Sequence, residues 1–357
     1  MVLGRIILIA FLITLIVILN NNINNKKHTI MKKQLIMMAC ILMASIAAFA
    51  GTNSKILLQH EGGVKVYDSD QMSQALADAV KGDTIFLSEG TYSGFELTKE
   101  VTIRGSGEKT VISGDLKIAI AGTPVCSVPL LESLRITGYL YINKAIKKLH
   151  IRKCFFRYFT VNDKIEDALI DRCASLYKNG DTYYYDSFNL STNIISMTVL
   201  NSKVYELSGS YNTGSVTFVN CIIRGRQGGS GQNYINCILD NAYSNSSSYD
   251  LVNASLTNCL YNISTSTGNY NSRIGSSCQL VNCYAIDNGD NSLQTLTIEE
   301  LTTNKYFGNE GTIVGPYGGN TPFVDSLAPA APKVSDSSIA LDLDNKKLNV
   351  SLKVTAE

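Results

Sequence analysis

An asparagine–cysteine pair closes the strand-like stretch SVTFVNCIIRG at residues 215–225. The same pair returns in three later stretches, which read QNYINCILDN (232–241), ASLTNCLYNI (254–263) and CQLVNCYAID (278–287). Apolar and polar residues alternate before the pair, as they do in β-strands that bury one face. A motif that recurs at a similar spacing indicates a structural repeat.

Aligning these pairs extends the repeat towards the N-terminus as a five-residue unit with an apolar residue at its centre. The unit reads VTIRG (101–105), LRITG (134–138), LHIRK (149–153), ALIDR (168–172), MTVLN (197–201), VTFVN (216–220), QNYIN (232–236), ASLTN (254–258) and CQLVN (278–282), with LKIAI (116–120) in the one long gap. Period-two strands without helices between them indicate a solenoid made of strands alone. The sequence therefore predicts an all-β fold, a right-handed parallel β-helix over residues 51–325.

The asparagine of each pair has a physical role at a sharp corner between strands. Asparagine and glycine tolerate the left-handed backbone that such a corner requires, and stacked amides can bond to one another. We expect a ladder of Asn201, Asn220, Asn236, Asn258 and Asn282. Earlier units place Gly105, Gly138, Lys153 and Arg172 at the same position.

The cysteines after the asparagines form a second column. It consists of Cys221, Cys237, Cys259 and Cys283, preceded by Cys154, Cys173 and, as its odd member, Ser202. We favour packed free thiols, because side chains in register on parallel strands point the same way and not at one another. Eight cysteines after residue 50 also leave disulfides open for a secreted chain.

The first fifty residues have the features of a targeting segment. From Met31 the chain reads MKKQLIMMACILMASIAAFAGT, with two lysines, an apolar stretch and Ala-Phe-Ala before Gly51. This pattern predicts a signal peptide over 31–50 and a protein that is secreted, periplasmic or on the cell surface, with no membrane span after cleavage. A lipid anchor on Cys40 is the alternative to cleavage after Ala50. Residues 1–30 are interpreted as an upstream extension from an early start codon, with a signal anchor as the alternative.

Composition excludes several classes of partner. The formal net charge is +1 and no run of Lys or Arg is longer than two residues, so nucleic acid is not expected as a partner. The part of the chain after the signal has no CxxC motif and only two histidines, His60 and His150, which disfavours zinc. No cofactor is expected; calcium would enter only if the protein were a lyase.

Two segments carry a resemblance to a known family. Residues 68–92, DSDQMSQALADAVKGDTIFLSEGTY, combine a capped amphipathic helix with a strand and a Gly-Thr-Tyr turn, and residues 314–323 read VGPYGGNTPF. They resemble the opening and closing segments of secreted pectin-lyase-like β-helix proteins of Bacteroidetes type. The resemblance implies a helix that caps the N-terminal end of the solenoid, but it implies no single activity, since this fold hosts lyases, hydrolases and adhesins.

The C-terminus adds a linker and a hairpin. Residues 326–333 are rich in proline and alanine, and 334–357 hold two alternating segments around Asp344-Asn345. We expect a β-hairpin that covers or extends a sheet edge. A sorting signal for export is the alternative.

Candidate functional residues follow the ladder by four positions. Arg224 and Asp240 fall on successive coils there, with Arg226 nearby; a lyase would need such arginines to neutralise a uronate. An exposed ion pair of about 0–1 kcal/mol is the alternative. Tyr177, Tyr183 and Tyr184 could stack on sugar rings or pack in loops.

The functional expectation is a protein that binds a polysaccharide or another cell-surface partner. The Asp-Asp and Gly-His-Gly motifs of polygalacturonase-like hydrolases are absent, and no cluster of calcium-binding acids is evident. A polysaccharide lyase and a structural adhesin remain the alternatives, and the oligomeric state stays open.

Overall fold

The structure is a computed structural model of the whole chain, and it describes the following residues: 54–60, 63–179, 182–185, 188–189, 193–208, 214–227, 229–240, 251–262, 274–286, 293, 296–309, 311–323, 333–342 and 347–355. The expected signal peptide, the upstream extension and the linker up to residue 332 lie outside these residues.

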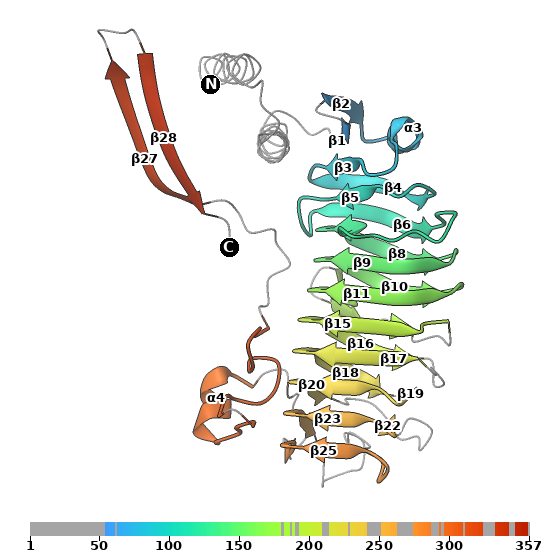
Figure 1. Ribbon diagram of the computed structural model, residues 1–357, viewed down its shortest axis with the longest axis vertical. Coiled ribbons are helices and arrows are strands. Elements are labelled where there is room, and N and C mark those ends of the chain that lie inside the picture. The colour runs from blue at the N-terminus through green and yellow to red at the C-terminus, as the bar shows by residue number, and fades with distance from the viewer. Residues whose placement is uncertain are drawn as a thin grey trace.

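The coils of the chain stack along a single axis and form two long sheets (Figure 1). The twelve-stranded sheet runs in the order β2 (Gly63–Asp68), β1 (Lys55–His60), β3 (Thr84–Leu87), β5 (Thr102–Arg104), β7 (Leu131–Glu132), β9 (Ile146–Arg152), β11 (Ile165–Asp171), β15 (Ser196–Leu200), β17 (Ser215–Val219), β20 (Asn233–Ile235), β23 (Ser255–Thr257) and β25 (Gln279–Val281). The ten-stranded sheet runs in the order β26 (Tyr284–Ile286), β24 (Leu260–Asn262), β21 (Ile238–Asp240), β18 (Ile222–Gln227), β16 (Lys203–Ser208), β14 (Phe188–Asn189), β10 (Phe155–Val161), β8 (Arg135–Ile142), β6 (Thr110–Ile118) and β4 (Gly90–Leu97).

Parallel pairing dominates both sheets, so the fold is a parallel β-solenoid with little helix. Only β1 pairs antiparallel within them, with β2 and with β3. The remaining elements are α3 (Met72–Asp78), β12 (Leu176–Asn179), β13 (Thr182–Tyr185), β19 (Gly229–Ser230), β22 (Leu251–Val252), α4 (Ile298–Thr303), β27 (Lys333–Asp342) and β28 (Lys347–Thr355). The chain alternates between the two sheets, and each coil pairs with the next.

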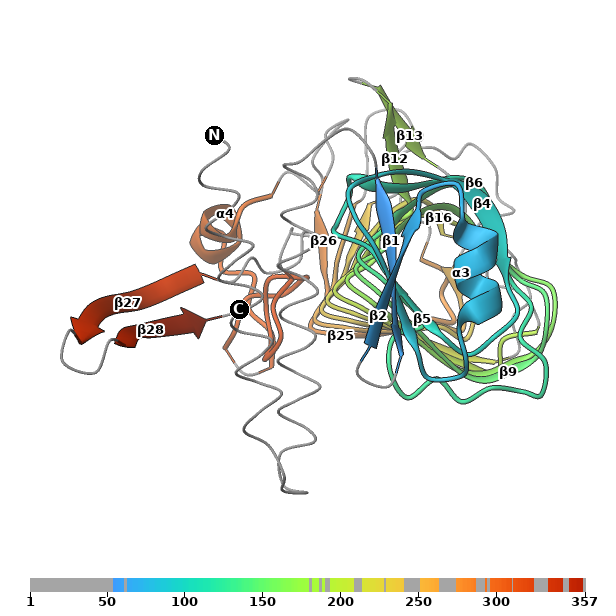
Figure 2. The ribbon, with the colours of Figure 1, turned by 90° about the horizontal axis from the view of Figure 1, so that it is seen from above.

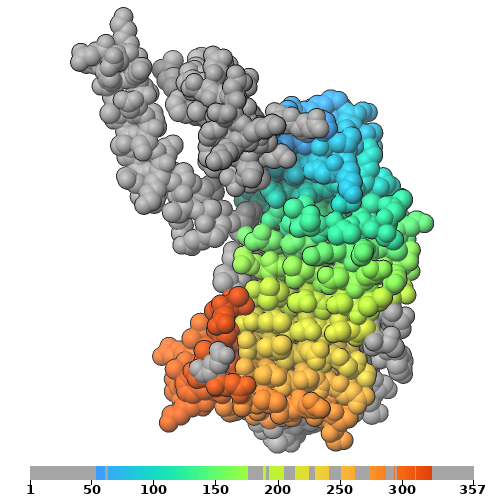
Figure 3. Space-filling view, in the orientation of Figure 1, coloured from blue at the N-terminus to red at the C-terminus, as the bar shows by residue number. Residues whose placement is uncertain are grey.

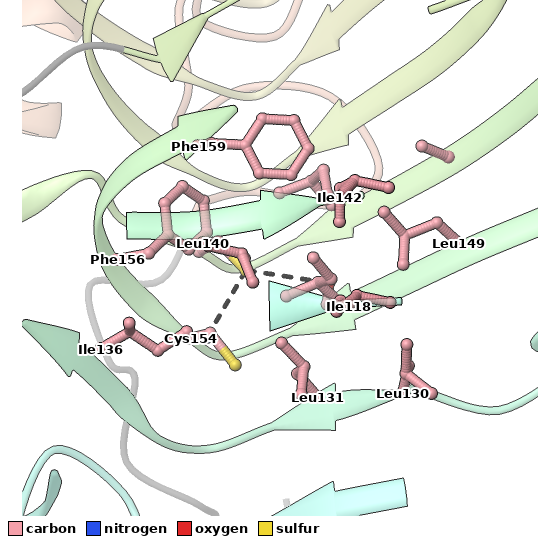
Figure 4. Packing of buried hydrophobic residues seen from close by; sticks show 14 of the residues in the cluster. Ile118, Leu130, Leu131, Ile136, Leu140, Ile142, Leu149, Cys154, Phe156 and Phe159 are labelled. Carbon is pink, nitrogen blue, oxygen red and sulfur yellow. Dashed lines mark hydrogen bonds between the residues drawn. The ribbon is translucent and has the colours of Figure 1, made fainter. Parts of the chain in front are cut away.

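Apolar columns from both sheets fill the interior. In the twelve-stranded sheet the register aligns Ile151, Ile170, Val199, Phe218 and Tyr234, all fully buried. Side chains from both sheets meet between the layers (Figure 4). Because alternate residues of each strand point inward, every coil adds to one continuous core.

Two of the predicted repeat units belong to the other sheet. Ile136 lies in β8, where it pairs with Ile112 and Phe156, and the central position of that coil is taken by Leu131 of β7. The LKIAI segment likewise contributes Leu116 and Ile118 to β6 of the ten-stranded sheet. These assignments were wrong because strands of both sheets carry the same period-two pattern.

The corners after the twelve-stranded sheet repeat one backbone conformation. Eight residues that directly follow its strands have φ between +48° and +56°: Ser133, Lys153, Arg172, Asn201, Asn220, Asn236, Asn258 and Asn282. Glycine was expected at two further corners, and neither has this conformation. Gly138 lies within β8, and Gly105 is needed instead for close approach, since a Cβ there would lie 2.3 Å from the Ser133 carbonyl oxygen.

The cysteine thiols donate hydrogen bonds to backbone carbonyls at the corners. All eight described cysteines are free thiols. Six of them place Sγ 3.2–3.4 Å from the carbonyl oxygen two residues earlier: Cys154, Cys173, Cys221, Cys237, Cys259 and Cys283. The Ser202 hydroxyl donates in the same way to Leu200, at 2.7 Å. From Cys173 onwards each thiol also contacts a carbonyl of the preceding coil, for example that of Val199 from Cys221 at 3.3 Å.

The asparagine amides bond between turns only in part. Asn282 Nδ2 donates to Asn258 Oδ1 at 3.4 Å. Asn220 instead donates its Nδ2 to the carbonyls of Pro316 and Gly318, at 2.9 and 2.7 Å. The corner therefore also anchors residues 311–323, called here the C-terminal segment, which lie against the side of the last coils (Figure 3).

Helix α3 lies at the N-terminal end of the stack, with Met72 and Ala75 buried (Figure 2). The N-terminus of α3 was expected to be capped by a side chain, but the side chain of the N-cap residue Gln71 accepts no hydrogen bond from the first turn of the helix. Among the residues that the structure describes, no helix has the length and apolar character needed to cross a membrane.

Candidate functional site

Arg224 and Asp240 lie opposite one another on the neighbouring strands β18 and β21. Arg224 Nε is 4.0 Å from Asp240 Oδ2; the arginine side chain is 25% exposed and the aspartate only 1%. The pair is therefore not the exposed ion pair considered above. A buried carboxylate requires a cationic or hydrogen-bonding partner, so neutralising Asp240 is a structural task for Arg224.

The other residues expected at this site are less closely defined. Arg226 lies two residues further along β18, and its side chain falls outside the described part of the structure. The tyrosines Tyr177, Tyr183 and Tyr184 lie in the antiparallel hairpin of β12 and β13, where Tyr177 pairs with Tyr184. Their side chains also fall outside the described part, although Figure 2 shows that the hairpin projects from the stack.

A group of aromatic side chains gathers on the outer face of β8 and β10. We call Tyr139, Tyr141 and Tyr158 the tyrosine cluster. The Tyr139 ring stacks on Tyr158 of the next coil, with centroids 4.3 Å apart and planes at 14°. It also stacks on Tyr141 of its own strand, at 5.1 Å and 11°. Strand alternation explains the outward direction, since the intervening Leu140 is fully buried.

Charged groups flank the tyrosine cluster. The Arg157 guanidinium carbon lies 5.2 Å from the Tyr158 ring centroid, within the range of a cation–π contact. Asp115 Oδ1 accepts the backbone N–H of Tyr139 at 2.9 Å. Burial raises the pKa of Tyr141, and the nearby Asp115 adds to the shift, so this phenol stays neutral at ordinary pH.

Sequence reasoning missed the tyrosine cluster. Tyr139 and Tyr141 alternate within GYLYI, which is a signal of a shared outward face, but Tyr158 stands 19 positions after Tyr139. Only the register of β8 with β10, which pairs Tyr139 with Tyr158, brings the rings together.

A row of alternating charges crosses the C-terminal ends of β5, β7, β9 and β11 in the twelve-stranded sheet. Arg104 Nε lies 2.7 Å from Glu132, and Glu132 lies 3.7 Å from Arg152 Nη1. Arg152 Nε lies 3.3 Å from Asp171, whose second carboxylate oxygen lies 3.8 Å from Arg172. Because each carboxylate sits between two cations, these groups stabilise one another and their pairing argues for a structural role.

Within the described part of the chain, no three His, Cys, Asp or Glu side chains come together in a way that could hold a metal ion. The His60 ring nitrogen Nδ1 lies 2.8 Å from Asp83, which also accepts the Val80 backbone N–H. That contact joins β1 to the turn after α3.

Comparison of the chain with protein-family models, with curated proteins and with solved structures finds no match. Fold and local geometry therefore carry the functional argument.

Proposed function

We propose that this protein is exported and binds a polysaccharide or a cell-surface glycan with the outer face of its ten-stranded sheet. The observation that carries the proposal is the tyrosine cluster with its flanking Arg157 and Asp115. For the fold we further infer right-handed winding, because parallel strand connections are right-handed with few exceptions, and a pectin-lyase-like architecture with α3 capping the N-terminal end. The signal-like residues 31–50 support export.

Aromatic rings suit sugar recognition because they offer an apolar surface with a polar hydroxyl at one end. Tyr139 is 38% exposed although it stacks on both of its neighbours. Rings that hold one another in place lose little side-chain freedom when a ligand binds, which lowers the entropic cost of association. The cluster is therefore a preorganised surface on a rigid sheet.

Arg157 gives the surface a preference among polysaccharides. A guanidinium forms strong hydrogen bonds with carboxylates, so acidic sugars such as uronates should bind more tightly than neutral ones. Successive parallel strands lie about 4.8 Å apart, and an extended polymer can therefore contact several coils at once.

The test is affinity electrophoresis and calorimetry with alginate, pectate, chondroitin and a neutral xylan. Tyr139→Ala should weaken binding of the acidic polymers about tenfold, through loss of the central ring. Phe307→Ala is the matched control, since Phe307 is equally exposed at 37% and lies between α4 and the C-terminal segment. Retention on no polymer, or equal retention of both variants, would overturn the proposal.

The same polymers distinguish binding from cleavage. A lyase reaction would leave an unsaturated product that is followed by its absorbance, with calcium present. We expect no such product, because Arg224 is engaged with the buried Asp240. A product that disappears in Arg224→Ala but persists in Phe307→Ala would favour the lyase alternative.

A further inference from the structure

The C-terminal end of the stack finishes on an open strand. β25 is the outermost strand of the twelve-stranded sheet, and all three of its residues are exposed. Leu280 is 44% exposed, whereas Leu256, which precedes it by one coil in the same inward-facing column, is fully buried. The apolar column of the core thus reaches solvent at this end.

β25 has backbone hydrogen-bonding groups on the side away from β23. The Gln279 N–H donates to Ala254, and the Val281 carbonyl accepts from Asn258, so these groups face β23. Alternation along a parallel ladder directs the N–H and C=O of Leu280 the other way. An edge strand of this kind is a template for a further strand.

The N-terminal end shows how this chain treats such an edge. There β3, the first strand of the parallel stack, pairs antiparallel with β1, and β1 pairs antiparallel with β2. A hairpin therefore extends the sheet, and Ile56 and Leu58 of β1 are buried.

A second hairpin, β27–β28, has no third strand within the described residues. Its register sets Ile339 opposite Val350 and Leu341 opposite Leu348, so apolar residues occupy matched alternate positions on both strands. An isolated two-stranded hairpin is marginally stable in water and gains from packing against another sheet. Figures 1 and 2 show it apart from the stack, and in Figure 1 it lies level with the N-terminal coils, at the opposite end from β25.

We propose that the β27–β28 hairpin docks on the C-terminal end of the solenoid of its own chain and covers Leu280. The ring centroid of Phe323 lies 5.6 Å from Nζ of Lys203 in β16. Strand β16 is four strands from β26 in the ten-stranded sheet. That separation is about 19 Å at about 4.8 Å per strand. The nine residues 324–332 span up to about 30 Å when extended, so they suffice.

Hydrogen–deuterium exchange of the full-length chain tests the proposal, with peptides that cover 274–286 as the probe. The Leu280 amide should exchange slowly in the native chain. Val350→Asp places a charge at an apolar position of the hairpin and should speed exchange of this peptide about tenfold. The matched control is Asn349→Asp, whose register partner is Ala340, and it should leave exchange unchanged.

Each outcome bears on the proposal. Peptides from β17 report whether the solenoid stays folded in every variant. Native exchange of Leu280 at the rate of an unprotected amide, or no response to Val350→Asp, would overturn the docking. Protection that appears only as protein concentration and molecular mass rise would show that a second copy occupies the end, and would overturn docking within one chain.

Discussion

A corner residue with φ near +50° decides which side chains the solenoid accepts there. A left-handed backbone costs an ordinary residue about 1–2 kcal/mol, whereas asparagine adopts it more readily. Five of the eight corners use asparagine, while Ser133, Lys153 and Arg172 bear the conformation without that advantage. The earlier coils are therefore more strained at this position.

Lys153→Asn should stabilise the protein. Its φ is +52°, and burial lowers the pKa of its ammonium, so the native lysine meets both backbone strain and desolvation. We expect the free energy of unfolding to rise by up to about 1 kcal/mol. Asn236→Ala, at the same φ of +52°, should lower it by about 1 kcal/mol. Denaturant titration measures both, and a destabilised Lys153→Asn would contradict this account of the corner.

The buried thiols make the protein sensitive to alkali. Burial raises the pKa of Cys154 to about 12 and holds those of Cys173, Cys237 and Cys259 well above their usual range. Above about pH 8.5 the unfolded chain loses thiol protons that the folded chain keeps, so the unfolded state binds fewer protons and stability falls as pH rises. Below that pH these thiols contribute no pH dependence.

Thermal unfolding between pH 7 and pH 11 should show this loss. Cys154→Ser should flatten the pH dependence and keep the fold, because Ser202 already donates to a carbonyl at the equivalent corner. Iodoacetamide labelling mapped by mass spectrometry gives an independent readout. Cys278 is partly exposed and should react before the six buried thiols, whereas the hydrogen bond with Cys259 and burial raise the pKa of the Cys283 thiol and slow its reaction. An equal rate at all eight would count against the packing.

At the scale of strands, the charge row joins the coils of the twelve-stranded sheet. Glu132 is 13% exposed and meets arginines of the strands on both sides. Glu132→Gln would leave Arg104 and Arg152 without their shared carboxylate, at a cost of about 1–3 kcal/mol. Glu166→Gln is the control: Glu166 is 45% exposed and pairs with Lys164 at 3.5 Å, so about 0.5 kcal/mol or less is expected. Equal losses in urea unfolding would refute a structural role for the row.

The sequence alone predicts part of the strand arrangement. The coiled parallel sheets and the central positions of Ile151 to Leu256 followed from period-two repeats. The sheet membership of Ile136 did not, because an inward-facing residue has the same pattern in either sheet. The tyrosine cluster and the partners of Asn220 depend on contacts over 19 and 96 positions, and no local pattern encodes such contacts.

In the molecule as a whole, most contacts run between neighbouring coils, as in other solenoids. The segment after α4 is an exception because it lies across several coils (Figure 3). Its Pro316 and Gly318 carbonyls accept from Asn220, and its Gly315 N–H donates to the Asn258 carbonyl. Buried Leu301 and Val314 pack with Ile238 and Leu260 of the ten-stranded sheet. This segment therefore couples coils that would otherwise meet only their neighbours.

Asn220→Gly separates this coupling from backbone strain, because glycine keeps the left-handed corner and removes only the amide. We expect a loss of about 1–3 kcal/mol for the two buried hydrogen bonds, together with faster hydrogen exchange across 311–318. Asn201→Gly is the matched control: its φ is +49°, and its buried Oδ1 has no hydrogen-bond partner among the described residues. If both variants exchange alike over 311–318, apolar packing alone holds the segment, and Asn220 serves the corner of its own coil.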